Sequence, residues 1–520
     1  MDRTPKITRK KLLESAAAGG GALLVGRQAG PAHASASAAA APRLDGRNII
    51  VFMTDQDRAI QHFPRGWAKQ NLPGLTRLRR YGLEFTNAFT NACMCSPARS
   101  TWMTGYFPAQ HGVKYTLEHD MPAPEYPQVE LPIDLPNLAT VAAAAGYTPV
   151  YKGKWHLNKP AGEEFTPGDV EKYGWTRWNP PDGGANQDIS EGGGGVTDHD
   201  GRYINDPEEG VIDYLTSSAA AEQPFFLVVS LVNPHDVLFY PKNYIEAGYD
   251  DSWLQGEIDL PATVDEDLST KPKAHEQFVK LFDLSGKLTT RQMKCNYLNF
   301  YANLMRSSDA YLVDVLDTLT DTGLLDSTLV IRTADHGEMG LTHGGMRQKN
   351  FNFYEESLRV PMIYSNPVFF PRPCQENALV SHVDFLPTVA SLMKAPDSAR
   401  ADWAGVDYSK LITGDSMKHP QDYIVFTYDD FQAGQASGPY IPPPNHIVSI
   451  RERRWKLAKY FDADGKKRSV YEMYDLKRDP LERRNLAYRG HKRTPLQERE
   501  FKRLKRKLAV VERKRLAALS

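Results

Sequence analysis

Three stretches of strand length, each followed at once by polar side chains, constrain the fold most. They cover residues 48–54, 224–232 and 328–333. The first two are largely apolar runs, which are typical of strands buried on both faces of a sheet, and the third is a further strand candidate. Asp55-Gln56 follows the first run, His235 lies just after the second, and Asp335-His336 follows the third. Since ligands in open parallel sheets lie beyond the carboxyl ends of the strands, these runs predict a polar site at one end of a sheet.

The remaining chain properties are those of an ordinary globular protein. The 520 residues are 41% hydrophobic and 24% charged, and the net charge is -1. There is therefore no overall field that would attract nucleic acid. No stretch is long and apolar enough to span a membrane. Four cysteines in this length do not form a disulfide framework, although the sequence leaves a Cys295–Cys374 pair open.

The stretch Cys95-Ser96-Pro97-Ala98-Arg99 carries the densest local chemistry. Pro97 suits the first turn of a helix, where its missing N–H costs nothing. Cys95 would then lie at a helix N-terminus, which favours an anion. The guanidinium of Arg99 offers planar donors suited to a tetrahedral oxyanion. The pattern indicates a nucleophile beside an anion-binding site, and a buried structural cysteine is the simpler alternative.

Four motifs along the chain together resemble those of one enzyme family. They are C-x-P-x-R at 95–99, G-K-W-H at 153–156, P-H at 234–235, and D-H-G-E at 335–338 with Lys349 downstream. This set is similar to the signatures of the type I sulfatases, which belong to the alkaline-phosphatase-like superfamily. The resemblance runs from about Asn48 to Ala487. It implies an alkaline-phosphatase-like α/β sandwich with a central, mostly parallel sheet, and a smaller C-terminal α+β domain with an antiparallel sheet.

The resemblance also implies a reaction. In this family the cysteine is oxidised to formylglycine by a formylglycine-generating enzyme, so Cys95 is the expected nucleophile after conversion and hydration to a gem-diol. One hydroxyl would attack sulfur and expel the alcohol, and the other would then release sulfate. Six side chains are the expected catalytic set: Cys95, Arg99, Lys154, His156, His235 and Lys349. Within it, His235 is the expected acid for the leaving group.

The resemblance implies one divalent cation as well. Its expected ligands are Asp55, Gln56, Cys95, Asp335 and His336. Gln56 stands where many sulfatases have Asp, and His336 where many have Asn. The oxygen donors favour Ca²⁺, while an imidazole and a neutral amide make Mn²⁺ the alternative.

The expected activity is therefore hydrolysis of a sulfate monoester of a small molecule or saccharide. Two alternatives stay open at this point. One is a phosphonate monoester or phosphodiester hydrolase, which shares the fold and the nucleophile. The Asp-Gln and Asp-His pairs found here resemble those of phosphonate monoester hydrolases. A sulfatase-like binding protein with unconverted Cys95 would not be an enzyme. The expected pocket walls are loops 179–201 and 431–444. The first of these loops is expected to be a flexible surface segment.

Four segments are expected along the chain. Residues 1–42 resemble a twin-arginine export signal, with Lys10 where the second Arg is expected, so the protein is expected to be periplasmic or secreted. Residues 43–400 would form the catalytic domain and 401–489 the antiparallel subdomain. Residues 490–520 would form a basic helical tail, and from Arg489 to Ser520 there are 12 Lys or Arg against 3 Glu. Its apolar stripe would pack on the body, or the tail would dock on an anionic surface or polymer.

Overall fold

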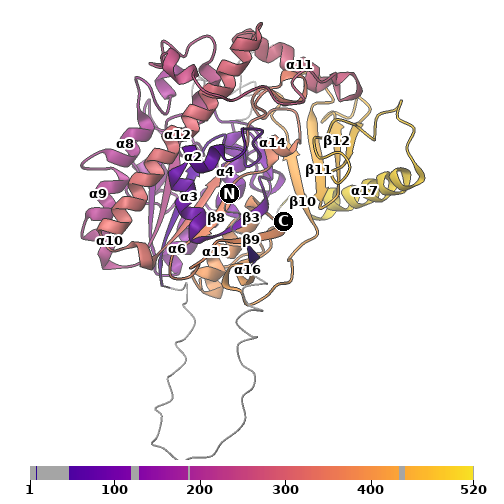
Figure 1. The fold of residues 1–520 in the computed structure, drawn as a ribbon. Coiled ribbons are helices and arrows are strands. Elements are labelled where there is room, and N and C mark those ends of the chain that lie inside the picture. Colours follow the sequence, from indigo (N-terminus) through magenta and orange to yellow (C-terminus); the bar gives the residue numbers. More distant parts are fainter. Residues whose placement is uncertain (1–6, 9–45, 119–127, 186–187, 433–439, 519–520) are drawn as a thin grey trace, which may run out of the picture.

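The computed structural model describes residues 7–8, 46–118, 128–185, 188–432 and 440–518. A large sheet with helices on both faces carries a smaller sheet at its side (Figure 1). Of the predicted export signal, only Ile7–Thr8 lies within the described residues, as the two-residue strand β1 at one edge of the large sheet. In the described part of the chain, no helix combines the length and apolar character that crossing a membrane requires.

The large sheet has eight strands in the order β1-β9-β3-β8-β7-β2-β6-β5. The strands after β1 are β2 (Asn48–Thr54), β3 (Gly82–Phe89), β5 (Thr148–Gly153), β6 (Phe225–Leu231), β7 (Thr328–Ala334), β8 (Met362–Ser365) and β9 (Cys374–Ser381). Every neighbouring pair is parallel except those made by β8, which is antiparallel to both β3 and β7. This confirms the predicted α/β fold with a mostly parallel central sheet.

Strand β2 lies at the centre of the large sheet, between β7 and β6. Its side chains alternate between two cores, as the two-residue period of a strand requires. Val51 and Met53 pack in the core that also contains helix α15 (Phe385–Leu392). Phe52 packs on the other face with helix α12 (Arg291–Asp321), the long diagonal helix of Figure 1. Apolar burial on both faces explains why β2 contains no polar side chain between Asn48 and Thr54.

The smaller sheet has five strands in the order β13-β12-β11-β10-β4. Its strands are β4 (Ala92–Cys93), β10 (Tyr423–Tyr428), β11 (His446–Glu452), β12 (Trp455–Phe461) and β13 (Val470–Asp475). The last four form an antiparallel meander, as predicted. The short β4 pairs with β10 in parallel. Since only Met94 separates β4 from Cys95, the smaller sheet is hydrogen-bonded to the chain segment that leads into the site.

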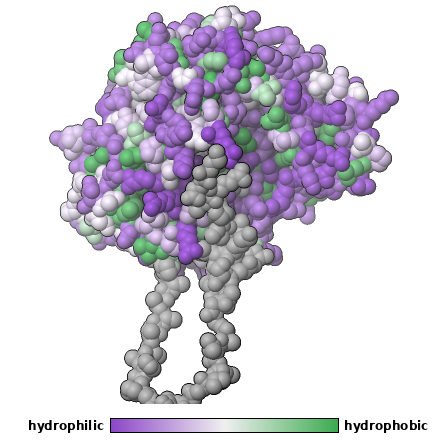
Figure 2. Space-filling view, viewed as in Figure 1, coloured by the Kyte–Doolittle hydropathy of each residue, from purple (hydrophilic) through white to green (hydrophobic). Residues whose placement is uncertain are grey.

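The tail after Arg489 forms helix α17 (Pro495–Lys514), which begins at a capping box between Thr494 and Gln497. Leu504, Leu508 and Val511 are buried against the smaller sheet, and Phe501 is half-buried beside them. The apolar stripe of the helix therefore packs on the body. Figure 2 shows the exposed surface on this side of the molecule as mostly hydrophilic, with apolar residues in small scattered groups.

Two segments between the strands complete the environment of the site. Residues 250–290 contain short helices, as predicted: η3 (Asp251–Leu254), η4 (Leu268–Thr270), α11 (Lys273–Phe282) and η5 (Asp283–Ser285). The described part of loop 179–201 differs from the expected flexible surface segment, because its glycines approach other groups closely. The backbone N–H groups of Gly193 and Gly194 donate to the Asp236 carboxylate. None of the four cysteines, all within the described residues, forms a disulfide.

Candidate active site

Cys95 is the first residue of helix α4 (Cys95–Thr104), every residue of which is buried. Pro97 lies in the first turn, as predicted, and Gly105 ends the helix with a φ of 72°. The extended backbone of Met94 brings the chain in from β4. The Cys95 side chain therefore lies at the positive end of a buried helix dipole, where a developing negative charge is stabilised.

The ends of β2 and β7 bring two carboxylates together beside Cys95. Thr54 pairs with Ala334, so Asp55 and Asp335 follow in adjacent positions. Donor atoms of Asp55, Cys95, Asp335 and His336 all lie within 4.8 Å of one another, and all four residues are buried. Cys95 Sγ is 3.2 Å from His336 Nε2 and 3.7 Å from Asp55 Oδ1. The structure thus assembles four of the five residues predicted to bind the cation.

The orientation of His336 suits a metal ligand. Its Nδ1 lies 3.1 Å from the carbonyl oxygen of Gly337, so a neutral ring places the hydrogen on Nδ1. The lone pair of Nε2 then faces the two carboxylates, each at 3.7 Å. A backbone acceptor that fixes the tautomer in this way is common among metal-binding histidines.

Arg99 holds the two carboxylates from behind. Its Nε donates to Asp335 Oδ2 at 3.0 Å, and its Nη2 donates to Asp55 Oδ2 at 3.2 Å. Its Nη1 donates to Ser230 Oγ at 2.8 Å and to the carbonyl of Lys154. This arrangement does not provide the predicted contact between Arg99 and an oxyanion. The donors of Arg99 face protein acceptors, and Arg99 does not line the pocket.

Lys154 is also fully buried beneath the site. Its Nζ lies 2.7 Å from Asp55 Oδ2 and donates to the carbonyl of Gly184 at 2.6 Å. Burial alone would lower the pKa of Lys154, but the charge of Asp55 outweighs it and raises that pKa. Lys154 is therefore a fixed positive charge next to Asp55.

The fifth predicted ligand, Gln56, contacts two charged side chains through its amide. Its Oε1 accepts a hydrogen bond from Lys349 Nζ at 2.7 Å. Its Nε2 donates to the buried Glu338 carboxylate at 2.6 Å. Tyr297 also donates to Glu338 at 2.7 Å. Gln56 adopts a left-handed backbone with a φ of 65°, and its N–H donates to Asp335 Oδ1 at 3.1 Å.

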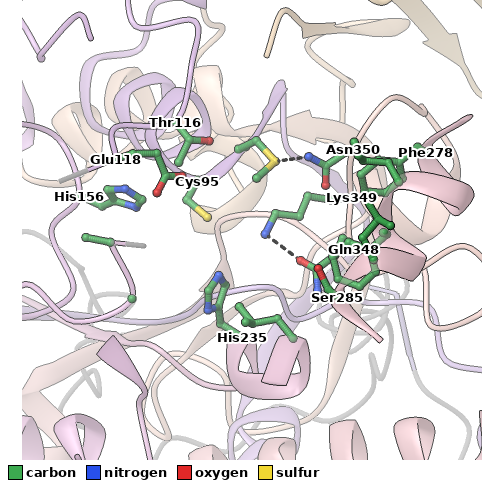
Figure 3. A pocket seen from close by; sticks show the side chains of 17 residues that line it. Cys95, Thr116, Glu118, His156, His235, Phe278, Ser285, Gln348, Lys349 and Asn350 are labelled. Atoms are coloured by element: carbon green, nitrogen blue, oxygen red, sulfur yellow. Dashed lines mark hydrogen bonds between the residues drawn. The ribbon is translucent and has the colours of Figure 1, made fainter. Parts of the chain in front are cut away.

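A pocket of about 90 Å³ opens above Cys95 (Figure 3). Cys95, His156 and Glu118 lie on one side of it, and Gln348, Lys349 and Asn350 lie on the other. His235 closes a third side. Four of the six predicted catalytic residues therefore line one pocket, with Arg99 and Lys154 buried against Asp55 below it.

The two pocket histidines differ in how they are held. The carboxylate of Asp182 accepts the backbone N–H groups of Trp155 and His156, at 2.6 and 2.8 Å, and stabilises a left-handed φ of 59° at His156. His156 Nε2 lies 2.6 Å from the carbonyl of Leu117. Burial, followed by the charge of Lys154, holds the pKa of His235 well below its ordinary value.

The electrostatics of the carboxylate pair fit a divalent cation. Burial and the adjacent Asp55 raise the pKa of Asp335 to about 7. Burial also favours protonation of Asp55, but Lys154 and other neighbouring groups outweigh it, so its pKa is well below the usual range. Burial, followed by Asp55, raises the pKa of Cys95 to about 12. A cation would relieve the repulsion between two buried carboxylates, and the oxygen and imidazole donors suit Ca²⁺ or Mn²⁺.

Sequence patterns did not identify several residues that build this site. Asp182, Ser230 and Glu338 hold His156, Arg99 and Gln56 in place. Asp182 belongs to no recognisable motif, and Glu338 stood in the D-H-G-E motif without an assigned partner. Glu118 and the apolar residues of α11 reach the pocket from segments without a motif. The predicted wall 431–444 lies partly outside the described residues, since 433–439 are not described.

Two family models match the chain. The sulfatase model covers residues 47–395, and the model of the N-sulphoglucosamine sulphohydrolase C-terminal region covers residues 343–513. A choline-sulfatase of Rhizobium meliloti is 28% identical over 85% of this chain and 82% of its own length. A Δ4,5-hexuronate-2-O-sulfatase of Bacteroides thetaiotaomicron is 25% identical over 78% of this chain and 77% of its own length.

Solved structures share the fold. A 2-O GAG sulfatase has a TM-score of 0.66 at 20% identity, covering 90% of this chain and 92% of its own. The phosphonate monoester hydrolase of Agrobacterium radiobacter has a TM-score of 0.60 at 19% identity, covering 90% and 95%. The family model spans most of the chain and the predicted motifs converge on one pocket, so this protein belongs to the sulfatase family, within the alkaline-phosphatase-like superfamily, and is a sulfuric ester hydrolase.

Proposed function

We propose that this enzyme hydrolyses sulfate monoesters through a formylglycine formed from Cys95, with one bound divalent cation, and releases inorganic sulfate and an alcohol. The observation that carries the proposal is the position of Cys95. It begins a buried helix, lines the pocket, and lies within 3.7 Å of Asp55 and His336. A converting enzyme would have to oxidise Cys95 to formylglycine. The gem-diol formed by hydration of that aldehyde would then supply the attacking hydroxyl in the place of Sγ.

The residues on the pocket wall would position the sulfate group. Lys349 Nζ and the imidazoles of His156 and His235 surround the space in front of Cys95 (Figure 3). Lys349 supplies a positive charge for the sulfate oxygens. The anionic substrate would oppose the effect of Lys154 on His235, raise its pKa, and let it give a proton to the leaving alcohol oxygen.

Asp55, Asp335, His336 and the Gln56 amide oxygen would hold the cation, with Ca²⁺ as the first choice and Mn²⁺ as the alternative. A bound cation supplies charge neutralisation at a sulfate oxygen and lowers the pKa of the nucleophile. Arg99 orients both carboxylates through its ion pairs, and Lys154 pairs with Asp55; their positive charges favour the ionised forms of Asp55 and Asp335.

A second activity, hydrolysis of phosphonate monoesters or phosphodiesters, is favoured by one observation. Gln56 contributes no negative charge beside the cation, so the site tolerates a more anionic transition state. We therefore expect sulfate monoester hydrolysis as the main activity and a weaker phosphonate or phosphodiester activity beside it.

The test compares kcat/KM for matched aryl sulfate, aryl phosphonate and diaryl phosphate esters on converted protein. The sulfate should be the best substrate by at least about tenfold, or about 1.4 kcal/mol in barrier. A smaller margin would make phosphonate or phosphodiester hydrolysis the primary function.

The substrate is proposed to be a sulfated small molecule or saccharide. The relatives named above point both ways, one to choline sulfate and the other to an unsaturated hexuronate sulfate. We also propose that the protein is exported after a formylglycine-generating enzyme has acted on Cys95. Subcellular fractionation of the producing cells, with mass spectrometry of the Cys95 peptide, would test both the export and the conversion of Cys95.

A further inference from the structure

Glu118 brings a buried carboxyl group to the wall of the catalytic pocket. It is 8% exposed and lies on the same side of the pocket as Cys95 (Figure 3). Its backbone N–H donates to Gln128 Oε1 at 2.7 Å, which fixes the chain at this position. Among the described residues, the Glu118 side chain makes no hydrogen bond or ion pair. A carboxyl group that is more than nine-tenths buried and faces a cavity without a protein partner is suited to a ligand.

The surroundings of Glu118 add negative charge. The Asp430 carboxylate lies behind Thr116, from which it accepts two hydrogen bonds, at 3.0 Å from the backbone N–H and 2.9 Å from Oγ1. Burial and then the charge of Asp430 raise the pKa of Glu118 well above its ordinary value. A positive charge placed in the pocket would offset both effects.

The cationic side chains of the pocket floor are already committed elsewhere. Lys154 pairs with Asp55, and Lys349 donates to Gln56 and faces the sulfate position. Among the pocket-lining residues, Glu118 is the one carboxyl group, and no arginine lines the pocket within the described part of the chain. A second anionic group on the alcohol would therefore meet Glu118 without a counterion.

The wall contributed by residues 278–285 is mostly apolar. Phe278, Leu281 and Phe282 come from α11, and Leu284 and the polar Ser285 follow in η5. Figure 3 shows Phe278 and Ser285 on the opposite side of the pocket from Glu118. An aromatic ring and aliphatic groups facing a carboxyl group match an alkylammonium, whose methyl groups are apolar and whose charge is diffuse.

We propose that Glu118 is a specificity-determining residue that selects the leaving alcohol by its charge, favouring an alkylammonium alcohol over a neutral one and rejecting an anionic one. This rests on the proposed sulfate ester hydrolysis and narrows its substrate class to esters without a second anionic group. Polysulfated or uronate-containing saccharides are then poor substrates. The interaction is electrostatic, so it should weaken in high salt.

The test uses three esters of similar size: choline sulfate, its neutral isostere 3,3-dimethylbutyl sulfate, and the sulfate ester of 4-hydroxybutanoate. The wild-type enzyme should turn over the cationic ester with a kcat/KM at least about tenfold above the neutral one, and the neutral one at least about tenfold above the anionic one. In Glu118→Gln the three values should converge to within about threefold. Glu118→Asp should keep the order.

Controls separate this proposal from the proposed function. Glu163→Gln, an exposed carboxylate outside the pocket, should leave all three ratios unchanged. Calorimetric binding to Cys95→Ala should show the same charge order, which the added Glu118→Gln change should remove. If wild-type protein binds the esters in this order but cleaves no sulfate ester, the proposed function fails and the charge selection stands. An order that is absent in wild type, or retained in Glu118→Gln, overturns the role of Glu118.

Discussion

Lys349 Nζ donates a hydrogen bond of 2.7 Å to the side-chain oxygen of Gln56. The other end of the same amide donates to Glu338 at 2.6 Å. A side-chain amide can accept from an ammonium through its oxygen and donate to a carboxylate through its nitrogen at once. The neutral residue at position 56 is therefore matched to a buried carboxylate 282 positions later in the chain.

A charge-swap experiment tests this match. Gln56→Glu alone places two carboxylates against each other and should lower the free energy of unfolding by about 1–3 kcal/mol. Combining it with Glu338→Gln restores one donor and one acceptor. The double variant should recover stability, with a coupling energy of about 0.5–3 kcal/mol in denaturant unfolding. Additive effects of the two changes would show that the contact is not a matched pair.

Cys95→Ala should abolish turnover and leave the fold intact. The side chain is small and lies at a helix start, so its loss creates little cavity. Peptide mass spectrometry of active wild-type protein should show formylglycine at position 95, and Cys95→Ser should serve as a matched control of similar size. Active protein with only unmodified cysteine at this position would contradict the mechanism.

Removal of the cation should be visible without an activity assay. Asp55 and Asp335 are buried side by side. Because a chelator removes the cation that offsets the repulsion between these two carboxylates, chelation should lower Tm. Elemental analysis should find one Ca²⁺ or Mn²⁺ per chain in wild type and far less in Asp335→Asn. Exposed Asp250→Asn should keep the metal content of wild type. Active enzyme without stoichiometric metal would exclude the site.

Arg99→Lys should be strongly destabilising, although it keeps the charge. Arg99 bonds both Asp55 and Asp335 through its fork, and a lysine ammonium cannot reproduce that geometry. Breaking a buried ion pair costs about 3–5 kcal/mol. Denaturant unfolding measures this loss, and Arg77→Lys, in an exposed ion pair with Asp317, should change stability by less than about 1 kcal/mol. Equal, small effects of the two substitutions would contradict a structural role for Arg99.

His343 should make stability depend on alkaline pH. Its Nδ1 lies 2.8 Å from Glu266, its Nε2 lies 3.8 Å from Glu356, and its ring stacks on Tyr354 at 3.6 Å. Burial opposes the charge, but the hydrogen bond to Glu266 and the nearby carboxylate of Glu356 raise the pKa of His343 to about 9.

The pKa of His343 is higher in the folded than in the unfolded state. The contribution of charged His343 to the free energy of unfolding is therefore fully present below about pH 6.5 and is lost as pH rises through about 9. The expected size is about 3 kcal/mol. The stability difference between wild type and His343→Gln, measured by denaturant unfolding, should therefore shrink between pH 6 and pH 10. A difference that does not vary with pH would contradict a charged His343.

The tail helix should act through its apolar stripe. Leu508→Ala removes a buried side chain between α17 and the smaller sheet and should cost about 2–5 kcal/mol. Replacing exposed Arg499, Arg506 and Arg513 by Gln should leave stability unchanged and alter retention on an anionic polymer by less than about twofold. A large loss of retention would support the alternative, docking on an anionic surface.

The local sequence determined the strands and where each one ends. Apolar runs must be buried on both faces, and this requirement predicted β2 and β6 together with the polar residues after them. Pro97 indicated the first turn of α4, and the apolar stripe of the tail predicted its packing as a helix. These properties depend on neighbouring residues, so they can be recognised without knowing the fold.

Only the tertiary structure decided which side chains meet and which way they face. Arg99 binds Asp55 and Asp335 behind the pocket, and Glu118 enters the pocket from a segment without a motif. Such contacts join residues that are far apart in the chain, and they depend on strand order and register. A motif states which chemical groups are present, whereas the partners of a buried charge are fixed by the packing that removes it from water.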